Sequence, residues 1–139
     1  MNTSQIQLSL FRNISMNTTY EIKRALRMAI ADCRLSRDEI VDRMNKIAVR
    51  EGMRQTISKS SLDNWTKDSA PDRLPSLPWL TIFCSVLNTA EPIAAMIRPL
   101  GGEILSGPDV KLLIWARAER EKKTAVKKAR LAAQVLEVG

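Results

Sequence analysis

Apolar residues recur at three- and four-residue spacing along most of the chain, which is the pattern of amphipathic helices. This spacing predicts five short helices between residues 18 and 100, and one long helix from residue 108 to about residue 136. The first helix is expected to start at Thr18 or Thr19, because Thr18 and Glu21 have capping-box spacing. Its inward stripe is predicted to be Ile22, Leu26, Ala29, Ile30 and Cys33, and its basic outer surface Lys23, Arg24, Arg27 and Arg34.

The second and third helices have clearer start signals. Ser36 and Glu39 form a full capping box, and Gly52 is a natural stop for the helix that follows. Ser58 is predicted to cap a short third helix over about residues 58–67. Three residues of this segment are expected to face the core and anchor it, namely Ile57, Leu62 and Trp65. The face left outside then carries Lys59, Ser60, Asp63, Asn64 and Lys67.

Two further helices follow a proline-containing loop. The fourth is entered through Pro78 and is expected to end at Asn88, with Trp79, Leu80, Phe83, Cys84 and Leu87 inward. Pro92 starts the fifth, with an inward face predicted to be Ile93, Met96, Ile97 and Leu100. Gly101 and Gly102 then break the helix. The sequence therefore predicts an all-α fold of five helices followed by a long C-terminal helix.

The two ends of the chain are expected to be separate from this domain, which should span residues 18–105. Residues 1–17 are predicted to be a flexible leader or, from the alternation between Gln5 and Leu10, a short strand. Residues 106–139 hold the C-terminal helix, where apolar residues keep a three-four spacing at Leu112, Trp115, Val126, Ala129, Ala133 and Leu136. Glu119 and Lys122 occupy the matching middle positions and interrupt the heptad.

Composition narrows the classes of function. The formal charge of +7 favours a polyanionic partner, because released counterions drive such association. Histidine is absent, and there is no phosphate-binding glycine loop, nucleophile elbow or HExxH helix. Cys33 and Cys84 are isolated and are expected to be core thiols. We therefore expect no enzyme activity, cofactor, metal site or small-molecule substrate.

The same sequence carries no signal for a membrane protein or a secreted one. No apolar run approaches the ~20 residues that a membrane span needs. The N-terminus lacks a basic region followed by an apolar stretch, so no secretion signal is expected. With two isolated thiols, the expected location is a reducing cytoplasm.

Two stretches resemble the lambda-repressor or Cro-like helix-turn-helix family. Residues 35–45 (LSRDEIVDRMN) are similar to the first motif helix, and residues 57–65 (ISKSSLDNW) to the recognition helix with its capping serine, inward aliphatic residue and tryptophan. The family usually joins these helices by a tight turn of ~3–4 residues. Here residues 46–56 intervene, so the second helix must be longer or the turn enlarged.

A closer resemblance is to small DNA-binding regulators of Mu-like phages and prophages, and CII-type phage regulatory proteins share parts of the layout. It is carried by residues 62–66 (LDNWT), 73–75 (RLP), 83–84 (FC) and 101–102 (GG), followed by a charged C-terminal helix. The resemblance implies a prophage-encoded regulator of early transcription or transposition. It also implies a location at the nucleoid of a bacterial host.

Placement in a recognition helix gives the polar residues candidate roles. Lys59 and Asn64 are suited to guanine and adenine edges in the major groove, and Asp63 to cytosine N4. The predicted phosphate contacts are Arg37, Ser58, Ser60, Ser61 and Lys67. The expected partner is double-stranded DNA. Each assignment has a structural alternative, since polar helix faces are usually solvated and capping serines can be purely structural.

The C-terminal helix keeps three interpretations open: a solvated helix, a dimerisation arm and a contact to the DNA backbone. Its middle stretch, residues 117–130, contains seven basic and two acidic residues. The basic ones are the candidates for a DNA or partner contact: Arg117, Arg120, Lys122, Lys123, Lys127, Lys128 and Arg130. The alternative function is a helical interaction module in phage replication or transposition that lacks sequence-specific DNA binding. An RNA-binding protein is disfavoured, because Phe and Tyr total three and offer no stacking platform.

Overall fold

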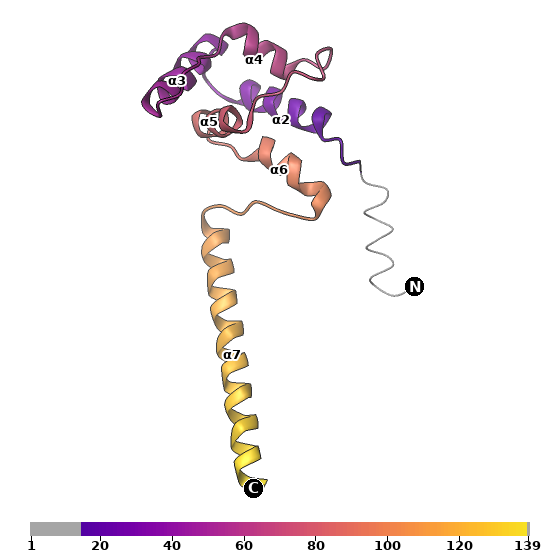
Figure 1. The fold of residues 1–139 in the computed structure, drawn as a ribbon, viewed down its shortest axis with the longest axis vertical. Helices are drawn as coiled ribbons and strands as arrows, with labels where there is room; N and C mark the ends of the chain where they lie inside the picture. Colours follow the sequence, from indigo (N-terminus) through magenta and orange to yellow (C-terminus); the bar gives the residue numbers. More distant parts are fainter. Residues whose placement is uncertain (1–14, 139) are drawn as a thin grey trace. The chain divides into compact units, whose positions relative to one another are not determined.

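The computed structural model describes residues 15–138, and this part of the chain is all-α (Figure 1). Its elements are α2 (Thr19–Asp32), α3 (Arg37–Arg50), α4 (Lys59–Thr66), α5 (Leu77–Leu87), α6 (Glu91–Ile97), the 3-10 helix η1 (Arg98–Leu100) and α7 (Pro108–Val138). The predicted fold class, five short helices and a long C-terminal one, is confirmed. The strand considered at Gln5–Leu10 lies outside the described residues.

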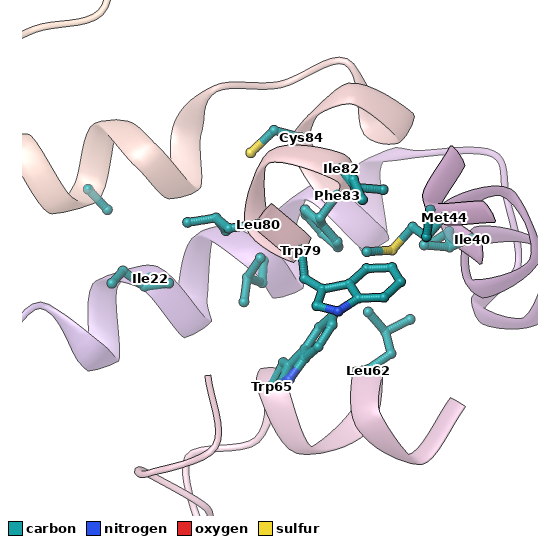
Figure 2. Close-up of a cluster of buried hydrophobic side chains, with 13 residues drawn as sticks. Ile22, Ile40, Met44, Leu62, Trp65, Trp79, Leu80, Ile82, Phe83 and Cys84 are labelled. Atoms are coloured by element: carbon teal, nitrogen blue, oxygen red, sulfur yellow. The ribbon is translucent and has the colours of Figure 1, made fainter. Parts of the chain in front are cut away.

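The chain forms two compact units, one ending at Glu103 and the other beginning at Ile104. The first unit holds a single aliphatic and aromatic core, to which α2, α3, α4, α5 and α6 all contribute. Figure 2 shows Trp79 of α5 pointing toward Trp65 and Leu62 of α4, with Met44 and Ile40 of α3 alongside. This core fixes the orientation of α4, because both large side chains on its inner face are part of it.

The end of α3 accounts for the long connection to α4. Helix α3 begins with the predicted capping box, in which Ser36 and Glu39 each accept a hydrogen bond from the other's backbone N–H. It runs on to Arg50 and ends in a Schellman motif, where Gly52 N–H donates to Val49 O and Met53 N–H to Ala48 O. Gly52 has φ +75°, a backbone conformation that favours glycine. The connection is therefore both a longer helix and an enlarged loop.

Two predictions about the other helices need correction. The capping box expected for Thr18 and Glu21 is wrong, because the Thr18 side chain makes no capping hydrogen bond to the described residues. Leu100 was expected inward but is 69% exposed. It lies in η1, whose tighter winding moves it off the inward stripe of α6. The buried residues of α6 are Pro92, Ala94 and Ala95, small side chains that let α6 approach α2 closely.

Other local predictions agree with the structure. Asn88 ends α5 in the left-handed conformation with φ 51°, and Pro78 lies in the first turn of that helix. Cys84 is buried, and burial raises the pKa of its thiol above the ordinary value. A buried thiol held in its neutral form is unreactive, which is how a core cysteine behaves.

Helix α7 makes up most of the second unit and has 31 residues. Its side chains are exposed along the described length except at Leu113 and Glu119, which are half-buried. Large apolar side chains are among the exposed ones, including Leu112, Trp115 and Val126. The part of the chain with structure contains no helix long and apolar enough to cross a membrane.

Candidate DNA interface

Helix α4 presents two different faces. Leu62 is fully buried and Trp65 is 8% exposed, so the inner face is held by the core. Lys59 and Ser60 are exposed on the first turn, and Lys67 is exposed directly after the helix. The outer edge of α4 is thus polar and accessible at its N-terminal end, which is the end that presents free backbone N–H groups.

The N-terminus of α4 is fixed from both sides. The Ser58 hydroxyl accepts a hydrogen bond from Ser61 N–H at 3.3 Å, and the two residues form a reciprocal capping box. One residue earlier, the Asn45 side chain of α3 pairs with the backbone of Ile57 through two hydrogen bonds of 2.8 and 2.9 Å. Asn45 therefore sets where the chain enters α4, and the cap sets the direction of the first turn.

The C-terminus of α4 is held by a buried lysine. The Lys23 ammonium group donates to the carbonyls of Asn64, Trp65 and Arg73 at 2.9, 3.2 and 2.8 Å. Lys23 is only 1% exposed, so its assignment to the basic outer surface of α2 was wrong. Desolvation lowers the pKa of Lys23, and the nearby Asp68 carboxylate opposes that shift. The ammonium group supplies the donors that the last carbonyls of a helix otherwise lack.

Arg37 and Asp63, both predicted to contact DNA, form an ion pair with each other at 2.7 Å. Arg37 also donates to the Thr66 hydroxyl at 3.3 Å, so it links the start of α3 to the middle and end of α4. The side chains are 34% and 47% exposed, which leaves both within reach of solvent. The pairing offsets the charge of Asp63, and this carboxylate therefore repels a nearby phosphate less than an unpaired one would.

The predicted contact residues of α4 are gathered on one short element but differ in exposure. Ser58, Lys59, Ser60 and Lys67 are exposed, whereas Ser61, Asp63 and Asn64 are half-buried. Ser58 and Ser61 already use their hydroxyls in the cap. The seven basic candidates of α7 belong to the second unit, and all of them are exposed.

The sequence interpretation missed the two residues that position α4 most directly, Lys23 and Asn45. A signal existed for Lys23, which lies three residues before buried Leu26 and so can share its side of α2. No comparable signal marks Asn45, because its partner is a backbone segment 12 residues away.

Comparison with known proteins adds nothing to this geometry, since no protein-family model, curated protein or solved structure matches the chain.

Proposed function

We propose that this protein is a sequence-specific double-stranded DNA-binding regulator whose helix α4 enters the major groove. The observation that carries the proposal is that the two sides of α4 differ. Leu62 and Trp65 hold one side in the core, and the accessible N-terminal end of the helix is polar. A major groove is wide enough to admit an α-helix, and base edges there carry a distinct donor and acceptor pattern. A phage or prophage origin, and a place at the nucleoid, follow only from the sequence resemblance.

The roles proposed for single residues follow from their places on α4. Lys59 is the exposed cation of the first turn and is assigned to base edges, together with the amide of Asn64. Phosphate contacts are assigned to Ser60 and Lys67, with the free backbone N–H groups at the helix start. Arg37 and Asp63 are paired, so we assign them mainly to holding the angle between α3 and α4.

The test begins with selection of bound duplexes from a random pool by the full chain. Enrichment of one motif is expected, and affinity for it should fall steeply as salt rises. Lys59→Ala and Asn64→Ala should each lower the selectivity for that motif over random duplex by about 1–3 kcal/mol, because each removes a base contact. Circular dichroism should show an unchanged fold.

Lys46→Ala is the matched control. It removes the same charge from an exposed position on α3, where Lys46 pairs with Asp42 at 3.1 Å. Loss of that charge should weaken binding to all duplexes alike and leave selectivity unchanged. A pool without an enriched motif would contradict the proposal and favour an interaction module that does not read DNA. Full selectivity in both α4 variants would contradict the assignment of α4 as the recognition helix.

A further inference from the structure

Helix α7 exposes a line of apolar side chains that a single copy leaves in water. Leu112 and Trp115 are each 62% exposed, Val126 is 46% exposed and Leu136 is 81% exposed. With Ala129 and Ala133 they follow the three-four spacing of a coiled-coil seam. These residues form two apolar groups on one side of the 31-residue helix, Leu112 with Trp115 and Val126 with Ala129, Ala133 and Leu136, whereas Ile114, Leu131 and Val135 are exposed on its other sides. Exposed apolar residues scattered singly are ordinary, but groups that share coiled-coil spacing mark a candidate interaction surface.

Two charged residues lie within this line and decide what can cover it. We define the α7 seam as the eight positions Leu112, Trp115, Glu119, Lys122, Val126, Ala129, Ala133 and Leu136. Neither Glu119 nor Lys122 forms an ion pair with another residue that the structure describes. The two side chains have opposite charge and are one seam step apart. A partner must therefore supply a positive group beside Glu119 and a negative group beside Lys122.

A second copy of the chain meets that requirement in one orientation only. We propose that α7 forms an antiparallel two-helix coiled coil with α7 of a second copy, in which Glu119 of each copy lies opposite Lys122 of the other. A parallel pair would place Glu119 opposite Glu119 and Lys122 opposite Lys122, two repulsive layers in succession. The antiparallel pair replaces them with two attractive contacts related by a two-fold axis, and two-fold dimers are the commonest symmetric assembly.

The same register also matches the sizes of four other seam residues, and it leaves Ala133 and Leu136 beyond the paired part of the seam. It places Trp115 opposite Val126, and Leu112 opposite Ala129, so a large side chain faces a smaller one in both layers. On one flank of the seam the helix carries Ala118, Ala125 and Ala132, which allow close approach without bringing like charges together. The basic residues of α7 other than Lys122 lie off the seam and stay accessible in the dimer. This dimer does not depend on the proposed DNA binding.

The first experiment reverses charges in the full-length chain and measures self-association by sedimentation. The unaltered chain should dimerise, and Glu119→Lys or Lys122→Glu should each raise the dimer dissociation constant at least about 10-fold, because both pairs become repulsive. The double variant E119K/K122E restores opposite charges and should regain the original dissociation constant. Glu121→Lys and Lys128→Glu make the same charge changes off the seam and should have little effect.

The second experiment determines orientation by oxidation of the double variant W115C/V126C. In the antiparallel dimer, residue 115 of one copy should be linked to residue 126 of the other. Trypsin cleaves after Arg117, so the product is a joined pair of peptides that contain these two positions. A bond within one copy is excluded, since 11 helical residues span about 16 Å and a disulfide needs Cα atoms within about 7 Å.

Each outcome of these experiments is decisive. Dimerisation that is weakened by both single reversals and restored by the double one, with 115-to-126 links, supports the proposal. A monomeric chain overturns it, and so do single reversals that leave the dimer intact or links that join 115 to 115 and 126 to 126. Failure here leaves duplex selection by α4 unaffected, and a failed duplex selection leaves the dimer test unaffected.

Discussion

Lys23 extends from α2 to the end of α4, where three main-chain carbonyls surround its ammonium group. Sequence alone assigns a lysine to the surface, since Lys is almost never fully buried unless it is paired. The acceptors that change this outcome belong to residues 64, 65 and 73, at least 41 positions away. No local pattern reveals backbone carbonyls left free by the end of another helix. The spacing to Leu26 could therefore indicate on which side of α2 Lys23 lies, but not that Lys23 binds the end of α4.

Replacing Lys23 with methionine should destabilise the first unit. The variant Lys23→Met keeps much of the side-chain volume but leaves three carbonyl acceptors without their donor. We expect the free energy of unfolding to fall by about 2–3 kcal/mol, since a buried polar group without a partner is costly. Urea unfolding followed by tryptophan fluorescence measures the loss. Arg24→Met on the exposed side of α2 is the control and should cost less than about 0.5 kcal/mol; equal costs would contradict the role assigned to Lys23.

The lowered pKa of Lys23 also makes its contribution depend on pH. Because the folded-state pKa lies below the usual 10.5, the unfolded chain binds the proton more tightly than the folded chain does. Between the two values stability therefore rises with pH, and below the folded pKa the desolvation cost is present in full. The stability of the native chain relative to Lys23→Met should increase as pH approaches 10.5. A difference that shrinks over this range would contradict the direction of the shift.

At the scale of elements, α3 and α4 both begin with a capping box, and α4 depends on its surroundings more than α3 does. It has eight residues, and isolated helices shorter than ~12–15 residues are marginal in water. Its start is held by the Ser58 cap and Asn45, and its end by Lys23. The cap was predictable from sequence, because a serine with a partner three residues on is a local signal. The other two supports depend on tertiary structure.

Removal of the α4 cap should have a measurable cost. Ser58→Ala deletes the hydroxyl that accepts from Ser61 N–H, and we expect the free energy of unfolding to fall by about 1 kcal/mol. Ser76→Ala is a matched control, because Ser76 precedes α5 in the N-cap position but makes no side-chain capping hydrogen bond to the described residues. The difference between the two variants in urea unfolding isolates the cap. If Ser76→Ala costs as much as Ser58→Ala, the α4 cap has no special contribution.

The helices differ in how well their inward faces could be predicted. In α3 and α5 the large apolar residues at helical spacing are those found in the core, such as Ile40, Met44 and Phe83. After α5 the same rule selects Ile93 and Met96 of α6, which are half-buried against the core, and Leu100 of η1, which is exposed. The smaller Ala94 and Ala95 of α6 are more deeply buried. Helical spacing of large apolar residues identifies the inward face of a helix. A helix that packs closely on another one also buries small side chains, as α6 does with Ala94 and Ala95. The rule therefore misses the small residues that α6 buries.

At the scale of the whole molecule, positive charge is shared between two units with different chemistry. Residues 104–139 carry eight basic and four acidic residues, which contribute +4 of the formal charge of +7. The first unit contributes the rest, together with the apolar core of the molecule. The long helix was predictable because its helical spacing is a local pattern. Spacing alone could not predict a partner for the α7 seam, because Glu119 and Lys122 interrupt its apolar residues.

Removal of residues 104–139 should separate the properties of the two units. The core cluster draws only on residues between 22 and 96, so the shortened chain should unfold cooperatively with a free energy within about 0.5 kcal/mol of the full chain. The same chain should sediment as a monomer at every concentration, because the α7 seam is gone. Its selectivity among duplexes should persist, since α4 is intact, while overall affinity falls with the loss of +4 charge and of the second copy. A shortened chain that fails to fold would show that the first unit depends on α7 for its stability, and one that still dimerises would place the self-association surface on the first unit instead.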